Sequence, residues 1–252
     1  MTAIVDPTAE IGDGVTIGPY SIIGPNVTIG ERTRVGPHVL IERDTTVGID
    51  CVLHKGAVLG TDPQDLKYDG EPTRLLVGDR TVIREYATLN RGTAALGYTE
   101  VGQDCLLMAY THVAHDCRIG DHVILSNSVN MGGHVSIGDW AIVGGVTPIH
   151  QFVRIGAHSF VGGASRVAKD IPPFVKAAGS PIQLYGLNSV GLQRRGFSEE
   201  ARRELKRAYR LFFASSHNTS QALAIARDEL KMLPEIEAFL AFFAESARGV
   251  SV

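Results

Sequence analysis

The sequence predicts a mainly β fold with an α-helical tail: a parallel β-helix of stacked, three-sided coils, followed by a C-terminal helical domain. Two observations predict it. Aliphatic residues recur at every sixth position from Val5 to Val167 with two interruptions, and this period fits neither an α-helix nor a plain alternating strand. From about Gln183 the apolar residues take helical spacing instead. We therefore expect a β-helix domain over residues 1–182 and a helical domain over residues 183–252.

The repeat places an aliphatic residue at ten successive sixth positions, and seven of the residues directly after them are glycine. A small or β-branched residue stands four places after the aliphatic one. We expect both to point inward, with the glycine relaxing the corner between strands. Three strands would close a coil of about 18 residues, and coils would stack about 4.8 Å apart as parallel strands. The ten aliphatic residues are Val5, Ile11, Ile17, Ile23, Ile29, Val35, Ile41, Val47, Leu53 and Leu59.

Two polar, glycine-bearing segments interrupt the repeat, at residues 61–76 and 92–100. We expect them to loop out of the prism, and loops on a rigid scaffold often carry function. The repeat ends near Pro172 and Pro173, where proline is expected to stop strand pairing.

Three helix starts are visible in the tail. Ser198 is a good N-cap because acidic residues follow it in the first turn. Ser220 can cap a second helix, and Pro234 suits the first turn of a third. We expect the Leu and Phe residues of these segments to pack between the helices and against the prism.

The composition excludes several functions. Lys and Arg number 24 and Asp and Glu 27, a net charge of −3, so we expect no nucleic-acid partner. No stretch approaches the roughly 20 apolar residues of a membrane span, and no secretory signal is visible. The three cysteines suit a reducing, cytoplasmic location. Cys51, Cys105 and Cys117 all occupy the inward small position, so we expect inert thiols and no acyl-cysteine intermediate.

Histidines of three successive coils fall on one outer edge of the predicted prism. The repeats that open at Val113, Met131 and Ile149 are 18 residues apart, so they should stack on one face. His122 and His158 share a different face, and we expect them to be solvated surface residues. The side chains expected to gather on the first edge are His112, His115, His134, His150 and Gln151.

Three interpretations of this cluster are open. Neutral imidazoles are common ligands of divalent metals. Histidine also titrates near neutral pH, which suits a general base. The third interpretation is a set of surface histidines without chemistry. The spacing favours a site over coincidence but does not choose between a metal and a base.

Several segments that the repeat does not demand resemble one known family, in the same order. They include QDLKY and GEPTR in the first insertion and LQRRGFS in the tail, beside LLMAYTHVAHDCRIG in the prism. Over nearly the whole chain, the sequence resembles the acyl-carrier-protein-dependent UDP-N-acetylglucosamine O-acyltransferases, the first enzymes of lipid A assembly. The resemblance implies a left-handed β-helix and a homotrimer with clefts between its prisms. It also implies no cofactor and no metal.

The resemblance further implies a direct transfer of an (R)-3-hydroxyacyl group from acyl carrier protein to the 3-hydroxyl of UDP-N-acetylglucosamine. His115 would be the general base, and Asp116 would steady its imidazole. Adjacent strand residues normally face opposite ways, so this pairing requires a turn that reorients one of them. The backbone N–H of Gly133 would stabilise the oxyanion, where a single donor can contribute about 3 kcal/mol.

A set of substrate-binding residues is also implied by the resemblance. Gly163 stands where the family limits acyl length, and a glycine leaves room for a long chain. The sequence departs from the family at Val190, where an acidic residue often contacts the nucleotide, and at Pro181, where a histidine can occur. The implied substrate-binding residues are Gln64, Asp65, Lys67, His112, His134, His150, Gln151, Gly163, Asn188, Arg194 and Arg195. Those in the tail would hold the uridine diphosphate.

Other functions stay open beside this one. The related N-acyltransferases usually carry a separate N-terminal uridine-binding domain, for which a repeat that begins at Val5 leaves no room. A transferase that acts on a 3-amino sugar is not distinguished by the sequence. A zinc hydratase on the same prism needs three histidines at about 2.0–2.1 Å from one metal. A non-catalytic scaffold predicts that changing His115 leaves activity unaffected.

Overall fold

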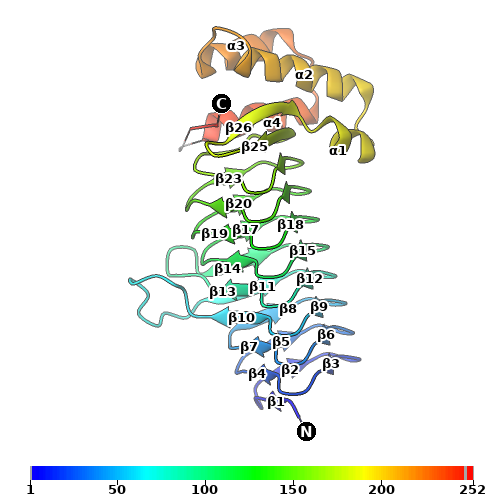
Figure 1. Cartoon of the computed structure of the whole chain (residues 1–252), viewed down its shortest axis with the longest axis vertical. Coiled ribbons are helices and arrows are strands. Elements are labelled where there is room, and N and C mark those ends of the chain that lie inside the picture. Colours follow the sequence, from blue (N-terminus) through cyan, green and yellow to red (C-terminus); the bar gives the residue numbers. More distant parts are fainter. Residues whose placement is uncertain (1, 247–248, 252) are drawn as a thin grey trace.

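Each six-residue repeat folds into a short strand and a tight turn, and three repeats complete one coil of a left-handed β-helix (Figure 1). The computed structural model describes residues 2–246 and 249–251. Strands of successive coils pair in parallel and build three flat sheets, which we call sheets A, B and C. The six-residue period therefore predicted the architecture correctly.

The three sheets contain all the strands of the described residues. Sheet A contains β1 (Ile4–Val5), β4 (Ile22–Ile23), β7 (Leu40–Ile41), β10 (Val58–Thr61), β13 (Thr88–Asn90), β16 (His112–Val113), β19 (Asn130–Met131) and β22 (Pro148–Ile149). Sheet B contains β2 (Glu10–Ile11), β5 (Thr28–Ile29), β8 (Thr45–Val47), β11 (Arg74–Val77), β14 (Tyr98–Val101), β17 (Arg118–Ile119), β20 (Ser136–Ile137) and β23 (Arg154–Ile155). Sheet C contains β3 (Thr16–Ile17), β6 (Arg34–Val35), β9 (Val52–Leu53), β12 (Val82–Ile83), β15 (Leu106–Leu107), β18 (Ile124–Leu125), β21 (Ile142–Val143), β24 (Phe160–Val161), β25 (Val175–Ala178) and β26 (Gln183–Leu187).

The aliphatic residues of the repeat form the core of the prism. From Ile23 onward they are buried, and the small residues of the repeat are buried beside them. Val5 and Ile11 are 41% and 39% exposed because they belong to the first coil, which no further coil covers. The predicted inward orientation of the aliphatic residues is thus confirmed, and their side chains are partly exposed only at the open N-terminal end.

The corners turn differently from the prediction. At most of them, the residue three places after the aliphatic one takes a positive φ, as Asp116 (58°) and His134 (60°) do. The glycine that follows the aliphatic residue serves close approach instead. A Cβ on Gly30 would lie 2.6 Å from the carbonyl carbon of Gly48 in the next coil, although Gly30 has no left-handed φ. The expectation that this glycine relaxes the corner is therefore wrong, because its missing side chain lets the coils stack.

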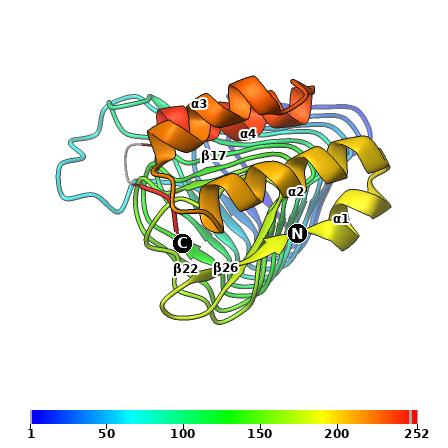
Figure 2. The same ribbon diagram turned by 90° about the horizontal axis from the view of Figure 1, so that it is seen from above.

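Both insertions leave the prism at the corner between sheets A and B (Figures 1 and 2). The first loop comprises residues 62–73, between β10 and β11, and the second comprises residues 91–97, between β13 and β14. Both loops are shorter than the predicted segments 61–76 and 92–100. The reason is that β11 and β14 are four residues long and pair with each other over their whole length. The last residues of both predicted insertions therefore belong to these strands.

Sheet C continues past the predicted end of the repeat. Beyond Pro173, β25 pairs in parallel with β24, and β26 adds an antiparallel edge strand. Gln183–Leu187 is therefore a strand, and helix begins only at Ser189. Leu184 and Leu187 pack against the core from this strand, and their spacing of three fits a helix equally well. For this reason the sequence placed the change to helix too early.

In the described part of the chain, four helices cover the C-terminal end of the prism (Figure 2). They are α1 (Ser189–Arg194), α2 (Glu199–Phe213), α3 (Thr219–Glu229) and α4 (Pro234–Glu245). The predicted N-cap Ser198 caps α2, and Pro234 occupies the first turn of α4. The prediction for Ser220 is wrong: Asn218 caps α3 and forms a capping box with Gln221, which satisfies two backbone donors at once.

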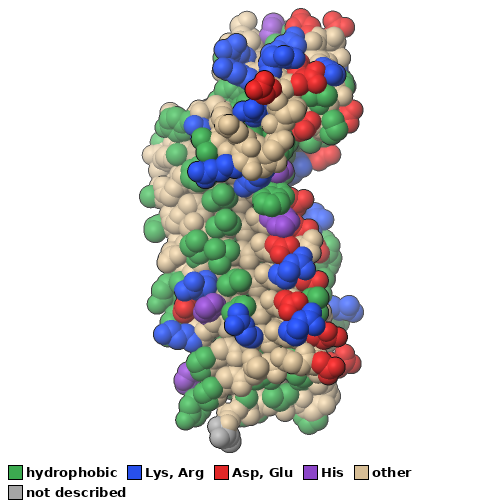
Figure 3. All heavy atoms as spheres, turned by 90° about the vertical axis from the view of Figure 1, so that its right-hand side faces the viewer, with side chains coloured by type: hydrophobic (Ala, Val, Ile, Leu, Met, Phe, Trp, Pro, Cys, Tyr) green, Lys and Arg blue, Asp and Glu red, His purple; other side chains and the backbone are tan. Residues whose placement is uncertain are grey.

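Aromatic side chains hold the helical cap together and attach it to the prism. Phe212, Phe239 and Phe243 contact one another between α2 and α4. The guanidinium of Arg154, on sheet B, lies 4.7 Å from the ring centre of Phe242 on α4. On the face shown in Figure 3, Lys and Arg side chains of the cap are interspersed with Asp and Glu side chains. Among the described residues, no helix combines the length and apolar character needed to cross a bilayer.

Candidate active site

The predicted histidine cluster lies at the corner between sheets A and B, which we call the A/B corner. Successive turns stack there through backbone hydrogen bonds. The N–H of His134 donates to the carbonyl of His115, and the N–H of Phe152 donates to that of Gly133, each over 3.0 Å. His115, Gly133 and Gln151 therefore occupy equivalent places in three successive coils, as the repeat predicted.

His115 and Asp116 form a hydrogen bond although they are neighbours in the chain. The distance from Nδ1 to Oδ2 is 2.8 Å. Neighbouring side chains on a strand face opposite ways, but the left-handed backbone of Asp116 turns its carboxylate toward the imidazole. Because a carboxylate can only accept, Nδ1 carries the proton in the neutral imidazole and Nε2 then offers a lone pair. The predicted pairing is present, and Nε2 has the chemistry of a general base.

Asp116 is 3% exposed, and both oxygens of its carboxylate accept hydrogen bonds. Thr93 donates its N–H to Oδ1 (3.0 Å) and its hydroxyl to Oδ2 (2.7 Å). The N–H of Asp116 donates to the hydroxyl of Thr99 (2.8 Å). Burial raises the pKa of Asp116, but the hydrogen bonds from His115 and Thr93 outweigh it, so the pKa lies below its usual range. Sequence reasoning missed both threonines, because Thr93 lies in an insertion that has no place in the repeat and Thr99 lies on β14, away from the histidine-bearing positions.

Gly133 lies directly against the imidazole of His115. A Cβ at this position would stand 2.6 Å from Nε2 and 3.0 Å from Nδ1, so only glycine fits beneath the ring. Its carbonyl accepts a bond from the next coil, whereas no acceptor among the described residues takes its N–H. An unpaired backbone donor beside a general base is the geometry that oxyanion stabilisation requires.

The other histidines of the cluster differ in their surroundings. His134 stacks on Phe152 (4.5 Å between ring centres) and meets the His115 ring edge-on at 5.2 Å. His112, on β16, hydrogen-bonds through Nδ1 to the hydroxyl of Thr88 (2.7 Å). Burial, together with the nearby charge of His115, lowers the pKa of His112, so its neutral form is favoured.

The last two members of the cluster are exposed on the same corner. Nδ1 of His150 lies 3.1 Å from the carbonyl oxygen of Gln151, and both side chains face solvent. The structure thus places all five predicted residues on or beside the A/B corner, with His115 as the most enclosed imidazole near a charged partner.

Three of these groups also have the geometry of a metal site. Ligand atoms of His115, Asp116 and His134 lie within 4.8 Å of one another. The set consists of two imidazoles and one carboxylate, whereas the predicted zinc hydratase needs three histidines. Nδ1 of His115 and both oxygens of Asp116 already serve hydrogen bonds inside the protein. The donor set therefore does not match the zinc site considered from the sequence.

The first loop carries the predicted residues Gln64, Asp65 and Lys67. It projects from the same A/B corner, after β10, two coils before the turn after β16 that carries His115 (Figure 1). The Asp65 side chain accepts the N–H of Lys67 (3.0 Å), and no hydrogen bond within the described residues joins these three side chains to the histidine cluster. The loop is fixed at its base by Arg91, which is 1% exposed and binds the Asp62 carboxylate and the Tyr68 hydroxyl.

The predicted nucleotide-binding residues lie at a different corner, between sheets B and C. The guanidinium of Arg195 lies 5.2 Å from the ring centre of Trp140 and donates to its carbonyl oxygen (2.9 Å). Asn188 caps α1 with its side-chain oxygen and donates its amide to the carbonyl of His158 (3.0 Å). Arg194 and Val190 are exposed. A single chain therefore does not bring these residues to His115.

The same corner corrects a prediction about two other histidines. His122 and His158 are not isolated surface residues, because a column of stacked rings runs along this edge. His122 stacks on Trp140 (3.9 Å), Trp140 is followed by His158 (6.3 Å), and His158 by Phe174 (5.7 Å). Burial and the charge of Arg195 lower the pKa of His158 to about 4. The repeat stacks equivalent corner positions at every edge, so the stacking that gathers the histidines at the A/B corner also gathers these rings.

Gly163 lies at the third corner, between sheets C and A, where it is exposed. The predicted site residues thus divide among all three corners of the prism.

The cysteines are placed as predicted: Cys51, Cys105 and Cys117 are buried free thiols. Burial raises the pKa of Cys105 to about 11 and that of Cys117 to about 12, which makes them poor nucleophiles.

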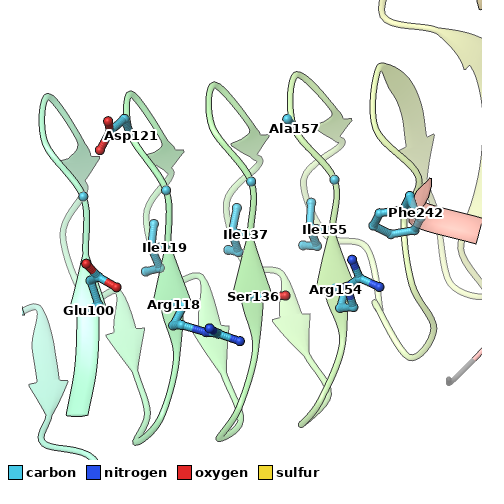
Figure 4. Close-up of a pocket in the computed structure, with 14 residues that line it drawn as sticks. Glu100, Arg118, Ile119, Asp121, Ser136, Ile137, Arg154, Ile155, Ala157 and Phe242 are labelled. Carbon is cyan, nitrogen blue, oxygen red and sulfur yellow. The ribbon is translucent and has the colours of Figure 1, made fainter. Parts of the chain in front are cut away.

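An open hollow of about 450 Å³ lies on the outer face of sheet B, below α4 (Figure 4). Glu100, Arg118, Ser136 and Arg154 line it from successive strands, and Phe242 of α4 lies at its end beyond Arg154. None of the predicted site residues lines it. The predicted site residues therefore lie at the corners of the prism, outside this hollow.

Comparisons with known proteins agree with this geometry. A model of the bacterial hexapeptide-repeat transferases matches residues 8–43 and 98–133, and a model of the second domain of UDP-N-acetylglucosamine O-acyltransferases matches residues 170–251. The acyl-[acyl-carrier-protein]–UDP-N-acetylglucosamine O-acyltransferase of Alkalilimnicola ehrlichii is 50% identical and covers 98% of this chain and 96% of its own. The chain belongs to the UDP-N-acetylglucosamine O-acyltransferase family.

Other members of the family agree with it in sequence and in fold. The acyltransferase of Thiobacillus denitrificans is 47% identical and covers 99% of this chain and 97% of its own. The solved acyltransferases of Acinetobacter baumannii and Bacteroides fragilis superpose with TM-scores of 0.97 and 0.98 at 43% and 42% identity. The first covers 100% of this chain and 98% of its own, and the second 99% and 98%. The protein is an acyltransferase with the family's β-helix, and neither the N-acyltransferase nor the hydratase alternative finds support.

Proposed function

We propose that the protein transfers an (R)-3-hydroxyacyl group from acyl carrier protein to the 3-hydroxyl of UDP-N-acetylglucosamine, the first step of lipid A biosynthesis. The observation that carries this proposal is the pairing of His115 with Asp116 beside the free N–H of Gly133. A base and an oxyanion donor on adjacent coils are what a direct attack on a thioester needs. The family membership supplies the substrates.

The reaction needs only these groups. Nε2 of His115 takes the proton of the sugar 3-hydroxyl as the oxygen attacks the thioester carbonyl carbon. Asp116 stabilises the imidazolium that forms, and the N–H of Gly133 binds the oxyanion of the tetrahedral intermediate. The intermediate collapses, the C–S bond breaks, and the imidazolium returns its proton to the departing thiolate. No acyl-enzyme forms, in keeping with the buried, weakly acidic cysteines.

The remaining side chains would bind the two substrates. Asp65 and Lys67 reach out on the first loop, beside Gln64, and would contact the acyl 3-hydroxyl and the sugar nucleotide. Gly163 would leave room for a long acyl chain. The residues of the histidine corner other than the base would line the pocket, namely His112, His134, His150 and Gln151.

A homotrimer would complete the site. Asn188, Arg194 and Arg195 would hold the uridine diphosphate, since planar guanidinium groups suit phosphate oxygens. They lie at the B/C corner of their own chain, and His115 lies at the A/B corner. In a ring of three prisms, the B/C corner of one chain can face the A/B corner of the next, which supports a shared site. The free thiols support a cytoplasmic location for this assembly.

The test replaces the proposed base. His115→Ala is expected to lower kcat for acyl transfer about 10²- to 10⁴-fold, because general base catalysis contributes that much. His38→Gln is the matched control, since His38 also stands at a corner of the prism but contacts Tyr20, far from the cluster. Circular dichroism and size-exclusion chromatography would show that both variants remain folded. Near-normal turnover of His115→Ala would refute the assignment.

The acceptor is tested in the same assay. UDP-N-acetylglucosamine and its 3-amino analogue are offered separately with the same acyl carrier protein. We expect transfer to the hydroxyl. Preference for the amine would replace the O-acyltransferase assignment with the 3-amino-sugar alternative and leave the role of His115 intact.

A further inference from the structure

We propose that Thr93 is a positioning residue for acyl transfer: from the loop of residues 91–97 it fixes the carboxylate of Asp116 in the orientation that holds His115. This inference rests on the proposed function. Thr93 touches neither substrate nor the reacting atoms in this proposal, so it acts through Asp116 alone.

The contact between Thr93 and Asp116 has two points. The hydroxyl of Thr93 donates to Oδ2 over 2.7 Å, and its N–H donates to Oδ1 over 3.0 Å. Two donors on two different oxygens prevent the carboxylate from rotating about χ2. Both residues are buried, at 8% and 3% exposure, so these bonds are shielded from water. Hydrogen bonds to a buried charge are worth more than those between neutral groups.

The same oxygen that accepts from Thr93 also accepts from the imidazole. Oδ2 of Asp116 receives the Thr93 hydroxyl and Nδ1–H of His115. The hydroxyl therefore takes up part of the negative charge that would otherwise act on the imidazole. Without it, the carboxylate would attract a proton on the imidazole more strongly.

The loop that carries Thr93 is itself held in place. The N–H of Gly97 donates to the carbonyl of Thr93 (2.7 Å), and the N–H of Ala95 donates to its hydroxyl oxygen (3.2 Å). The N–H of Ala94 donates to the carboxylate of Glu71, on the first loop (3.0 Å). The loop proposed to bind substrate and the loop that fixes Asp116 thus support each other.

The experiment compares three variants in steady-state kinetics. Thr93→Val keeps the size and the N–H but removes the hydroxyl, Thr93→Ser keeps the hydroxyl, and Thr33→Val is the control. Thr33 is buried at the N-terminal end of the prism, where its hydroxyl bonds to the carbonyl of Gly48 and to the N–H of Cys51. Thr33→Val therefore also removes the hydrogen bonds of a buried threonine hydroxyl, but at a site that does not contact Asp116.

We expect Thr93→Val to lower kcat roughly ten- to a hundredfold, the equivalent of one hydrogen bond to a charged group, while KM for both substrates changes little. The acid limb of its kcat/KM profile should move to higher pH. Thr93→Ser should restore both, and Thr33→Val should lower the melting temperature without moving the profile. If Thr93→Val does not fold, Thr93→Ala removes the same hydroxyl and provides the second measurement.

Three results would overturn the inference. The first is a normal kcat and an unmoved pH profile in Thr93→Val or Thr93→Ala. The second is a loss of kcat that Thr93→Ser does not rescue. The third is an equal shift of the profile in Thr33→Val. Failure of the proposed function looks different, because the unmodified protein would then not transfer the acyl group at all.

Discussion

His158 is one side chain through which the stability of the protein depends on pH. Its ring is packed against Phe174 and Phe197, and its Nδ1 is buried without a hydrogen-bond partner among the described residues. Burial and the charge of Arg195 lower its pKa to about 4, from about 6.5 in the unfolded chain. Between these values the unfolded state binds more protons, so stability falls as the pH drops from 6.5 toward 4.

We expect His158→Phe to remove this dependence. Phenylalanine keeps the ring stacking with Phe174 and has no nitrogen to protonate or to leave unpaired. The melting temperature of the variant at pH 7 should equal or exceed that of the unmodified protein. Its decrease between pH 6.5 and 4.5, measured by calorimetry at one protein concentration, should be smaller. Parallel decreases in the two proteins would show that His158 does not titrate in this range.

The residues of the candidate site differ in how visible they are from the sequence. His115, His134 and Gln151 follow from the repeat alone, because equal steps of the chain bring them to one corner. The hydrogen bond between Asp116 and His115 depends on the left-handed backbone conformation of Asp116, which the six-residue period does not specify. Thr93 reaches Asp116 from an insertion that has no register, so only the folded loop could place it.

Among the elements, the stacked coils depend on glycines that leave no room for a side chain. We expect Gly30→Ala to destabilise the protein by about 1–3 kcal/mol, because its Cβ would overlap the backbone of Gly48, which cannot move without opening the coil. Glu42→Ala is the matched control, since Glu42 holds the same place in its repeat and already has a side chain. Urea unfolding would compare them. Equal midpoints would show that the coils relax.

The strand that the sequence misplaced has a physical cause. Strands of two residues, and even the five residues of β26, are too short for their own propensity to decide between strand and helix, so pairing with a neighbouring strand decides it. The coils of the prism were predictable because the repeat encodes that pairing. In β26, pairing with β25 makes a strand of residues whose apolar spacing also fits a helix. The N-cap of α3 moved for a separate, local reason, since the side chains of Asn218 and Gln221 satisfy each other's backbone donors.

At the scale of the whole molecule, the proposed site residues lie at different corners of one chain, so the proposed trimer would make activity a property of the assembly. His115 and Arg195 stand at different corners of one prism. If the proposed trimer is correct, each site takes His115 from one chain and Arg195 from the next. A ring of three identical contacts is heterologous, so the two residues never need to come from the same chain.

Mixed trimers test this directly. His115→Ala and Arg195→Ala are each expected to be inactive as homotrimers. When the two chains are co-expressed in equal amounts, a site is intact only where an Arg195→Ala chain supplies His115 and its neighbour supplies Arg195. Random mixing places the chains in that order at about a quarter of the interfaces, so about a quarter of normal activity should return. If mixed trimers, verified by mass spectrometry, show no activity above that of the two variants alone, the proposal that neighbouring chains share the site is wrong.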